Sequence, residues 1–86
     1  MENLKEKLEP MVMEIIQLII KKNQDYGNAI FKQKMPAISL MLDMKISRLG
    51  NLIKNNDTPN FESIKDTLND IIGYALLGKI IQDEKA

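Results

Sequence analysis

The chain has 86 residues, about the size of one small domain and near the lower limit for a self-sufficient hydrophobic core. Its 12 Lys and Arg residues balance its 12 Asp and Glu residues, and this zero net charge gives no general attraction for nucleic acids or membranes. Because there is no Cys and no His, the composition excludes zinc fingers, disulfides, thiol nucleophiles and His-based acid–base pairs.

The first third of the chain has the pattern of an amphipathic helix. Its apolar residues recur at spacings of three or four, the period of one helix face, at Leu4, Leu8, Met11, Ile15 and Leu18. Pro10 suits a first helical position better than a helix interior, because its ring removes a hydrogen bond and clashes with the preceding turn. We therefore expect the main helix to run from about Pro10 to Asn23, with residues 2–9 as a separate or kinked turn.

Nothing in this first third indicates a membrane segment. The N-terminal residues alternate in charge and lack the apolar stretch of a signal peptide. The longest apolar-rich run, Met11 to Ile20, is shorter than the roughly 20 residues that span a bilayer. We expect a cytoplasmic chain without a membrane helix.

A second helix is predicted from Pro36 to about Lys54. Proline is well suited to a first helical turn, and the polar residues 55–60 provide a strong stop signal. Residues 24–35, between the first two helices, are expected to form an extended crossover.

The third helix is predicted to begin near Phe61 or Glu62, with Asn60 as its N-cap, and to continue to about Gln82. No window shows the strict alternation of a β-strand. The prediction is therefore a single all-α domain over residues 1–86, built of three helices of which the last two form a hairpin.

The second half of the third helix carries more apolar surface than three helices can cover. Its apolar residues extend most of the way round, at Ile71, Ile72, Tyr74, Ala75, Leu76, Leu77, Ile80 and Ile81. Such a helix is normally buried on nearly all sides. Gly73 and Gly78 are poor helix formers and indicate the close approach of another backbone. We infer that this helix packs against its copy in a homo-oligomer.

Two cations interrupt the apolar face of the second helix. Lys45 and Arg48 share a row with Met41 and Leu52, although other positions already supply a solvent-facing side. The two side chains either extend along the edge of the apolar seam toward water, or point into a cleft that holds an anion. In a cleft, Arg would offer a planar fork and Lys a point charge.

A row of carboxylates follows on the third helix, where Glu62, Asp66 and Asp70 are spaced by four. Such a row can be a solvated helix face, can pair with Lys45 and Arg48, or can hold a hard divalent cation such as Mg²⁺. The second helix offers no matching acidic pair, which weakens the metal interpretation.

Three segments, KKNQDYGNAIF, LDMKISRLGNLI and ESIKDTLNDIIGYALL, resemble the nucleotide-modification-associated helical domain common in phage genomes. That family is a distant relative of the all-α nucleoside triphosphate pyrophosphatases typified by MazG. The likeness covers roughly residues 14–81 and implies an association with nucleotides. It marks as site residues Lys21, Lys22, Asp25, Tyr26, Gly27, Lys45, Arg48, Glu62, Asp66, Asp70 and Tyr74. The pyrophosphatases hold magnesium with carboxylate pairs from two helices, and Lys45 and Arg48 here replace the first pair, which favours binding over hydrolysis.

The resemblance suggests a role for the segment NQDYGNAIF, residues 23–31. Tyr26 and Phe31 can stack on a base, Asp25 and Asn28 can hydrogen-bond base or ribose edges, and Gly27 permits close approach. The segment would then form a lid over a nucleotide. In the alternative interpretation the aromatic rings only anchor the crossover to the core, and Asp25 caps a turn.

Three functions are compatible with these features. The first is a small homo-oligomeric phage protein that binds a nucleotide or nucleotide-derived molecule without turnover or cofactor, and so sequesters a second messenger of a bacterial defence system. The second is a Mg²⁺-dependent nucleoside triphosphate pyrophosphatase, with Glu62, Asp66 and Asp70 as metal ligands. The third is a protein–protein interaction module built on the apolar third helix. The first is favoured, because the likeness points to nucleotides while the metal-ligand set is incomplete.

Overall fold

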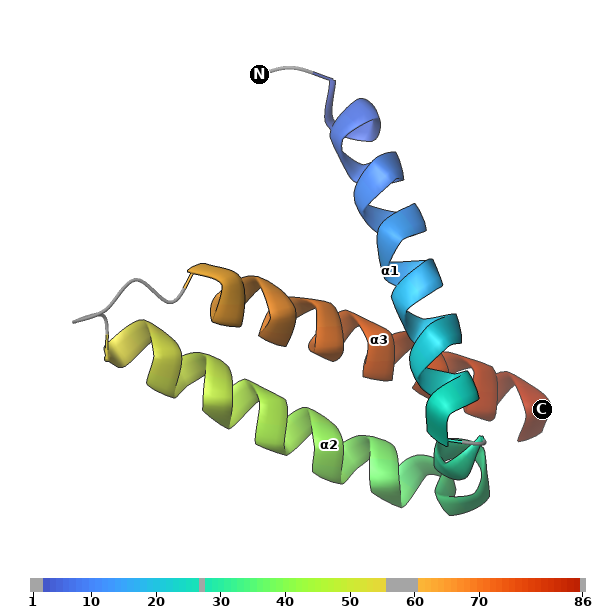
Figure 1. Ribbon diagram of the computed structural model, residues 1–86. Coiled ribbons are helices and arrows are strands. Elements are labelled where there is room, and N and C mark those ends of the chain that lie inside the picture. The colour runs from blue at the N-terminus through green and yellow to red at the C-terminus, as the bar shows by residue number, and fades with distance from the viewer. Residues whose placement is uncertain (1–2, 27, 56–60, 86) are drawn as a thin grey trace.

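The computed structural model describes residues 3–26, 28–55 and 61–85. These residues form three helices, α1 (Leu4–Tyr26), α2 (Ala29–Lys54) and α3 (Phe61–Lys85), and no strand. The all-α, three-helix prediction is therefore confirmed. The helices α2 and α3 lie side by side in opposite directions, and α1 crosses them toward the C-terminal half of α3 (Figure 1). The first half of α1 projects beyond both of the other helices (Figure 1).

The predicted break near Pro10 is wrong for the described residues. From Leu4 onward, α1 is one helix that contains Pro10 and extends past the predicted end at Asn23 to Tyr26. Pro10 removes a single hydrogen bond, to the Glu6 carbonyl, and the turns on both sides of it are exposed. Because water can satisfy that carbonyl, the helix continues through the proline.

The extended crossover expected over residues 24–35 is also wrong. Asn28 adopts the left-handed conformation (φ 64°), and α2 begins directly after it at Ala29. The amide of Asn28 donates to the Asn23 carbonyl at 3.3 Å, and the amide of Phe31 donates to the Asn28 carbonyl at 3.1 Å. Asparagine tolerates the left-handed region better than most residues, so Asn28 can lead directly into α2 where a long loop was expected.

A second departure from regular geometry lies within α2, at Lys34 (φ 63°, ψ −154°). It separates the first turns of α2 from the long part that continues to Lys54. The predicted start at Pro36 therefore matches the regular part of α2, but the preceding residues 29–33 are helical too.

Few side chains are buried in the described chain, and each helix contributes at least one. The buried side chains are those of Ile15 from α1, Ile38 from α2, and Thr67 and Ile81 from α3. The buried side chains of the described residues are therefore few, and those of α3 are spread along the helix from Thr67 to Ile81.

Two glycines of α3 let the other helices approach closely. A Cβ atom at Gly73 would lie 3.3 Å from Cγ1 of Ile19, and one at Gly78 would lie 3.1 Å from Cγ2 of Ile38. Close approach of another backbone was expected at both glycines, and in the single chain the neighbouring atoms belong to the side chains of Ile19 and Ile38. The absence of a side chain at Gly73 thus allows α1 to pack closely against α3.

Much of the apolar surface stays exposed in the single chain. The exposed large side chains include Leu4, Leu8, Met11, Val12 and Met13 of α1, Ile46 and Ile53 of α2, and Ile72 and Ile80 of α3. Among the described residues, the single chain thus leaves more large apolar side chains exposed than it buries.

No helix within the described ranges combines the length and the apolar character that crossing a bilayer requires.

Candidate functional site

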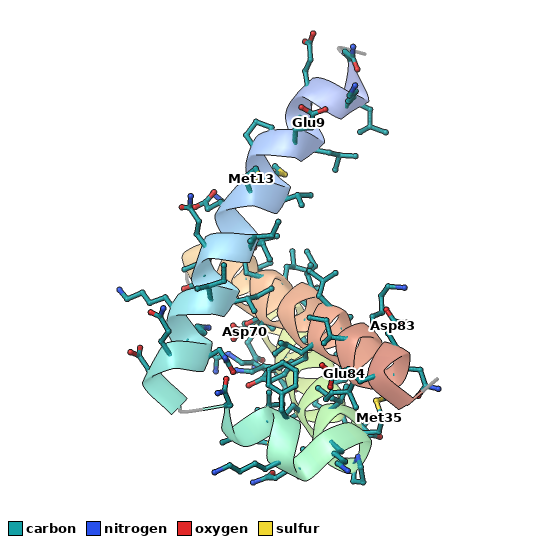
Figure 2. All side chains as sticks on the ribbon, turned by 90° about the vertical axis from the view of Figure 1, so that its right-hand side faces the viewer. Glu9, Met13, Met35, Asp70, Asp83 and Glu84 are labelled. Carbon is teal, nitrogen blue, oxygen red and sulfur yellow. The ribbon has the colours of Figure 1, made fainter. Side chains whose placement is uncertain are left out.

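An ion cluster joins all three helices around Asp70. Lys22 Nζ of α1 lies 2.6 Å from Asp70 Oδ1, and Lys45 Nζ of α2 lies 3.0 Å from Asp70 Oδ2. The Asp70 side chain is 18% exposed and points into the space between the helices (Figure 2). Each carboxylate oxygen thus contacts a different ammonium group, so the cluster fixes α1 and α2 to the same turn of α3.

The environment of Asp70 acts on its carboxyl in two opposing ways. Burial removes water from the carboxylate and raises its pKa, which is the largest single influence. The hydrogen bonds and charges of Lys22 and Lys45 together outweigh this effect, and the net pKa lies below the ordinary value of 3.8. Asp70 therefore stays ionised down to acidic pH, and its carboxylate remains paired with the ammonium groups of Lys22 and Lys45.

Acid should weaken the fold through Asp70. Its carboxyl has a lower pKa in the folded chain than in the unfolded one, so its contribution is complete above 3.8 and is lost as the pH falls through the folded value. Between about pH 5 and pH 2, we expect the free energy of unfolding to fall more steeply for the unmodified chain than for Asp70→Asn. Urea unfolding at a series of pH values measures both curves, and parallel curves would contradict the assignment.

A second polar link between α2 and α3 lies one turn away from the cluster. Arg48 Nε donates a hydrogen bond of 3.3 Å to Thr67 Oγ1, and the Thr67 hydroxyl donates one of 2.7 Å to the Ser63 carbonyl. Thr67 is only 1% exposed. Lys45 and Arg48 therefore both contact α3, and Lys45 is half-buried whereas Arg48 remains an exposed residue.

A cleft of about 370 Å³ lies between the three helices, next to this cluster. Most of its lining is aliphatic, with Ile19, Ile30 and Leu77 as one contributor from each helix. Its polar lining residues are Lys22, Asn23, Gln33, Asn69, Asp70 and Tyr74. An apolar floor with a few polar groups beside paired cations suits a small anionic molecule that has a flat apolar part.

The predicted site residues fall into two groups. Lys22, Asp70 and Tyr74 line the cleft, and Lys45 contacts Asp70 from outside the lining. The remaining described candidates lie away from the lining: Lys21, Asp25, Asn28, Arg48 and Asp66 are exposed, and Phe31 is half-buried. The side chains of Tyr26 and Glu62, the whole of Gly27 and the proposed N-cap Asn60 lie outside the described residues.

The segment that was expected to act as a lid has a different form. Asp25 belongs to the last turn of α1, and Phe31 to the first turn of α2. The Asn28 side chain accepts a hydrogen bond from the Asn23 amide group, so it joins the two helix ends. Residues of this region that do line the cleft are Asn23, Ala29 and Ile30.

The arrangement around Asp70 opposes the metal alternative. Both of its oxygens already contact lysine ammonium groups, which compete with a divalent cation for the same carboxylate. Among the described residues, no three acidic side chains gather where they could ligate a metal ion. The residues present thus fit a bound anion better than a bound magnesium ion.

Sequence reasoning missed Thr67 and the amide side chains of Asn23 and Gln33. Thr67 shares the apolar stripe of the third helix with Ile64 and Ile71, and a polar residue on such a stripe is the same signal that singled out Lys45 and Arg48. For Asn23 and Gln33 there was no comparable signal, because their position depends on the tight connection at Asn28.

The chain is similar to a known protein family. A family model described as nucleotide modification associated domain 1 matches residues 22–82, which include α2, most of α3 and every residue of the ion cluster. No match was found among curated proteins or solved structures. Since the matched segment covers well over half of the chain, the chain belongs to the nucleotide modification associated domain 1 family.

Proposed function

We propose that this chain binds a nucleotide or a nucleotide-derived small molecule in the cleft and releases it unchanged. The observation that carries the proposal is the position of Lys22 and Lys45, which meet on Asp70 beside an apolar cleft. The family description, which associates the domain with nucleotide modification, supports the same class of ligand.

The polar and apolar parts of the cleft match the parts of a nucleotide. A lysine ammonium group has three donors, so Lys22 and Lys45 can each keep Asp70 and still donate to a phosphate oxygen. The ring of Tyr74 offers a face on which a base can stack, and the amides of Asn23 and Asn69 can hydrogen-bond base edges. The volume of about 370 Å³ lies near the lower end of the range for small-molecule sites.

The cluster supports binding more than hydrolysis. The lysines hold Asp70 as a counter-ion, so it is poorly placed to ligate magnesium as the MazG-like pyrophosphatases require. We therefore propose further that this chain is a small phage protein, and that it acts by sequestering a nucleotide second messenger of a bacterial defence system. Its effect would then depend on affinity and on the number of copies, because no turnover multiplies it.

Thermal unfolding of the purified chain, with magnesium or with EDTA, tests the proposal. The panel contains nucleoside triphosphates, deoxynucleotides, cyclic dinucleotides and ADP-ribose derivatives, and the ligand is recovered afterwards and analysed by chromatography. A ligand at 100 times its Kd should add about 2.7 kcal/mol of stability, which is several degrees for a domain of this size. We expect a shift that does not need magnesium and a ligand that is returned intact.

Each other outcome selects a different function. Recovered monophosphate and pyrophosphate, formed only with magnesium, would establish a pyrophosphatase. If no nucleotide raises the melting temperature, the binding proposal is wrong and an interaction module becomes the better explanation.

A further inference from the structure

We propose that the first half of α1 is a self-association surface, through which two copies of this chain pair in antiparallel orientation. Leu4, Leu8 and Met11 are all exposed on this part of α1, which projects beyond α2 and α3 (Figure 1). In Figure 2, Glu9 and Met13 mark the same projecting turns, well away from Asp70.

The exposed stripe continues the one that packs inside the chain. Ile15 is buried, and Ile19 contacts the position of Gly73 on α3. Moving toward the N-terminus along the same face, Met11, Leu8 and Leu4 follow at spacings of four, three and four. The apolar face of α1 thus contacts α3 in its second half, whereas its first half is exposed and projects beyond α2 and α3 (Figure 1). A second amphipathic helix can cover such an exposed apolar face.

The spacing of these apolar residues favours pairing with a helix that has the same spacing. Apolar residues that alternate at intervals of three and four form the seam of a two-helix coiled coil, where each side chain fits between residues of the facing helix. A second copy supplies such a helix by two-fold symmetry, the commonest arrangement of soluble oligomers. Because the net charge of the chain is zero, two copies do not repel one another.

The charges beside the seam favour the antiparallel orientation. Lys7 and Glu14 are two turns apart on the same edge of the seam. When Leu8 faces the partner's Met11 in antiparallel pairing, Lys7 lies beside the partner's Glu14, and symmetry repeats this ion pair. In parallel pairing with the same seam, Lys7 would lie beside the partner's Val12, and no such pair forms.

Sedimentation equilibrium of the full chain tests both the surface and the orientation. We expect the unmodified chain to sediment at twice its 9.9 kDa. Lys7→Glu and Glu14→Lys should each raise the dimer dissociation constant at least ten-fold. In either variant, residue 7 of each copy has the same charge as residue 14 of the other copy, so like charges meet at two symmetric places. The double variant Lys7→Glu/Glu14→Lys should return it to within about three-fold of the unmodified value, since the pairs are restored with their signs exchanged.

Glu6→Lys is the matched control, because position 6 lies on the outer face of α1, away from the seam, and its charge reversal should leave the dissociation constant unchanged. Circular dichroism of every variant verifies that the helices are intact. A chain that remains monomeric at high concentration overturns the proposal, and so does a monomer that instead binds phosphatidylcholine vesicles. A dimer that the double variant fails to restore overturns the antiparallel pairing.

Discussion

Replacing Ile38 with Ala should lower the free energy of unfolding by about 2 to 5 kcal/mol. Ile38 is only 2% exposed, and its Cγ2 atom lies against the space where Gly78 has no side chain. Gly78 has no side chain that could fill the cavity that the substitution leaves. Since domains of this size are stable by about 5 to 15 kcal/mol, the loss is a large part of the total.

Urea unfolding followed by far-UV circular dichroism measures this loss. Ile46→Ala is the matched control, because it makes the same change on the same helix at a residue that is 57% exposed, and it should cost far less. Gly78→Ala sharpens the test: with Ile38 in place its new methyl group is crowded, whereas in the Ile38→Ala variant it has room and gains about 1 kcal/mol of helix propensity. Equal effects of Gly78→Ala in both backgrounds would show that the two residues do not pack together.

The helices themselves could be predicted because their signals are local. Apolar residues at intervals of three and four define the stripes of α1 and α3, and Pro36 begins the regular part of α2. Polar residues beyond Lys54 correctly placed the end of α2. Each of these signals acts within a few turns of the chain, so none depends on tertiary structure.

The connections were harder to predict because they depend on single residues. Asn28 precedes α2 directly because it adopts a left-handed conformation, which asparagine permits but does not require. Pro10 stays inside α1 because the only carbonyl that it leaves unpaired is reached by water. In both places the sequence allowed two local structures: exposure to water permits a continuous helix at Pro10, and the left-handed conformation of Asn28 permits a short connection.

The residues of the ion cluster could be singled out from the sequence, but the way in which they pair could not. Lys22, Lys45 and Asp70 were all singled out, yet the sequence could not show that one carboxylate holds both lysines. That geometry depends on the angle at which α1 crosses α3, and the contact between Ile19 and Gly73 helps to set it. Thr67 could have been singled out by its place on the apolar stripe of α3, but its hydrogen bond from Arg48 could not be predicted from the sequence.

Removing the charge of Lys45 should abolish most of the proposed nucleotide binding. Lys45→Met keeps an apolar stem of similar length, so the contact of this side chain with α3 is largely preserved. It removes the ammonium group that reaches Asp70 Oδ2 and that we propose donates to phosphate. A hydrogen bond to a charged group contributes about 1.5 to 3 kcal/mol, so the Kd should rise about 10-fold to 100-fold.

Calorimetry with the nucleotide that most stabilises the unmodified chain measures this change. Lys54→Met is the matched control, since it removes the same charge from an exposed position in the last turn of the same helix. If binding depends on general positive charge, the two variants weaken it equally and both lose affinity steeply with salt. If it depends on the cluster at Asp70, only Lys45→Met weakens it, because only Lys45 meets Lys22 on a shared carboxylate beside the cleft. Unchanged affinity in Lys45→Met would place the nucleotide somewhere other than this cluster.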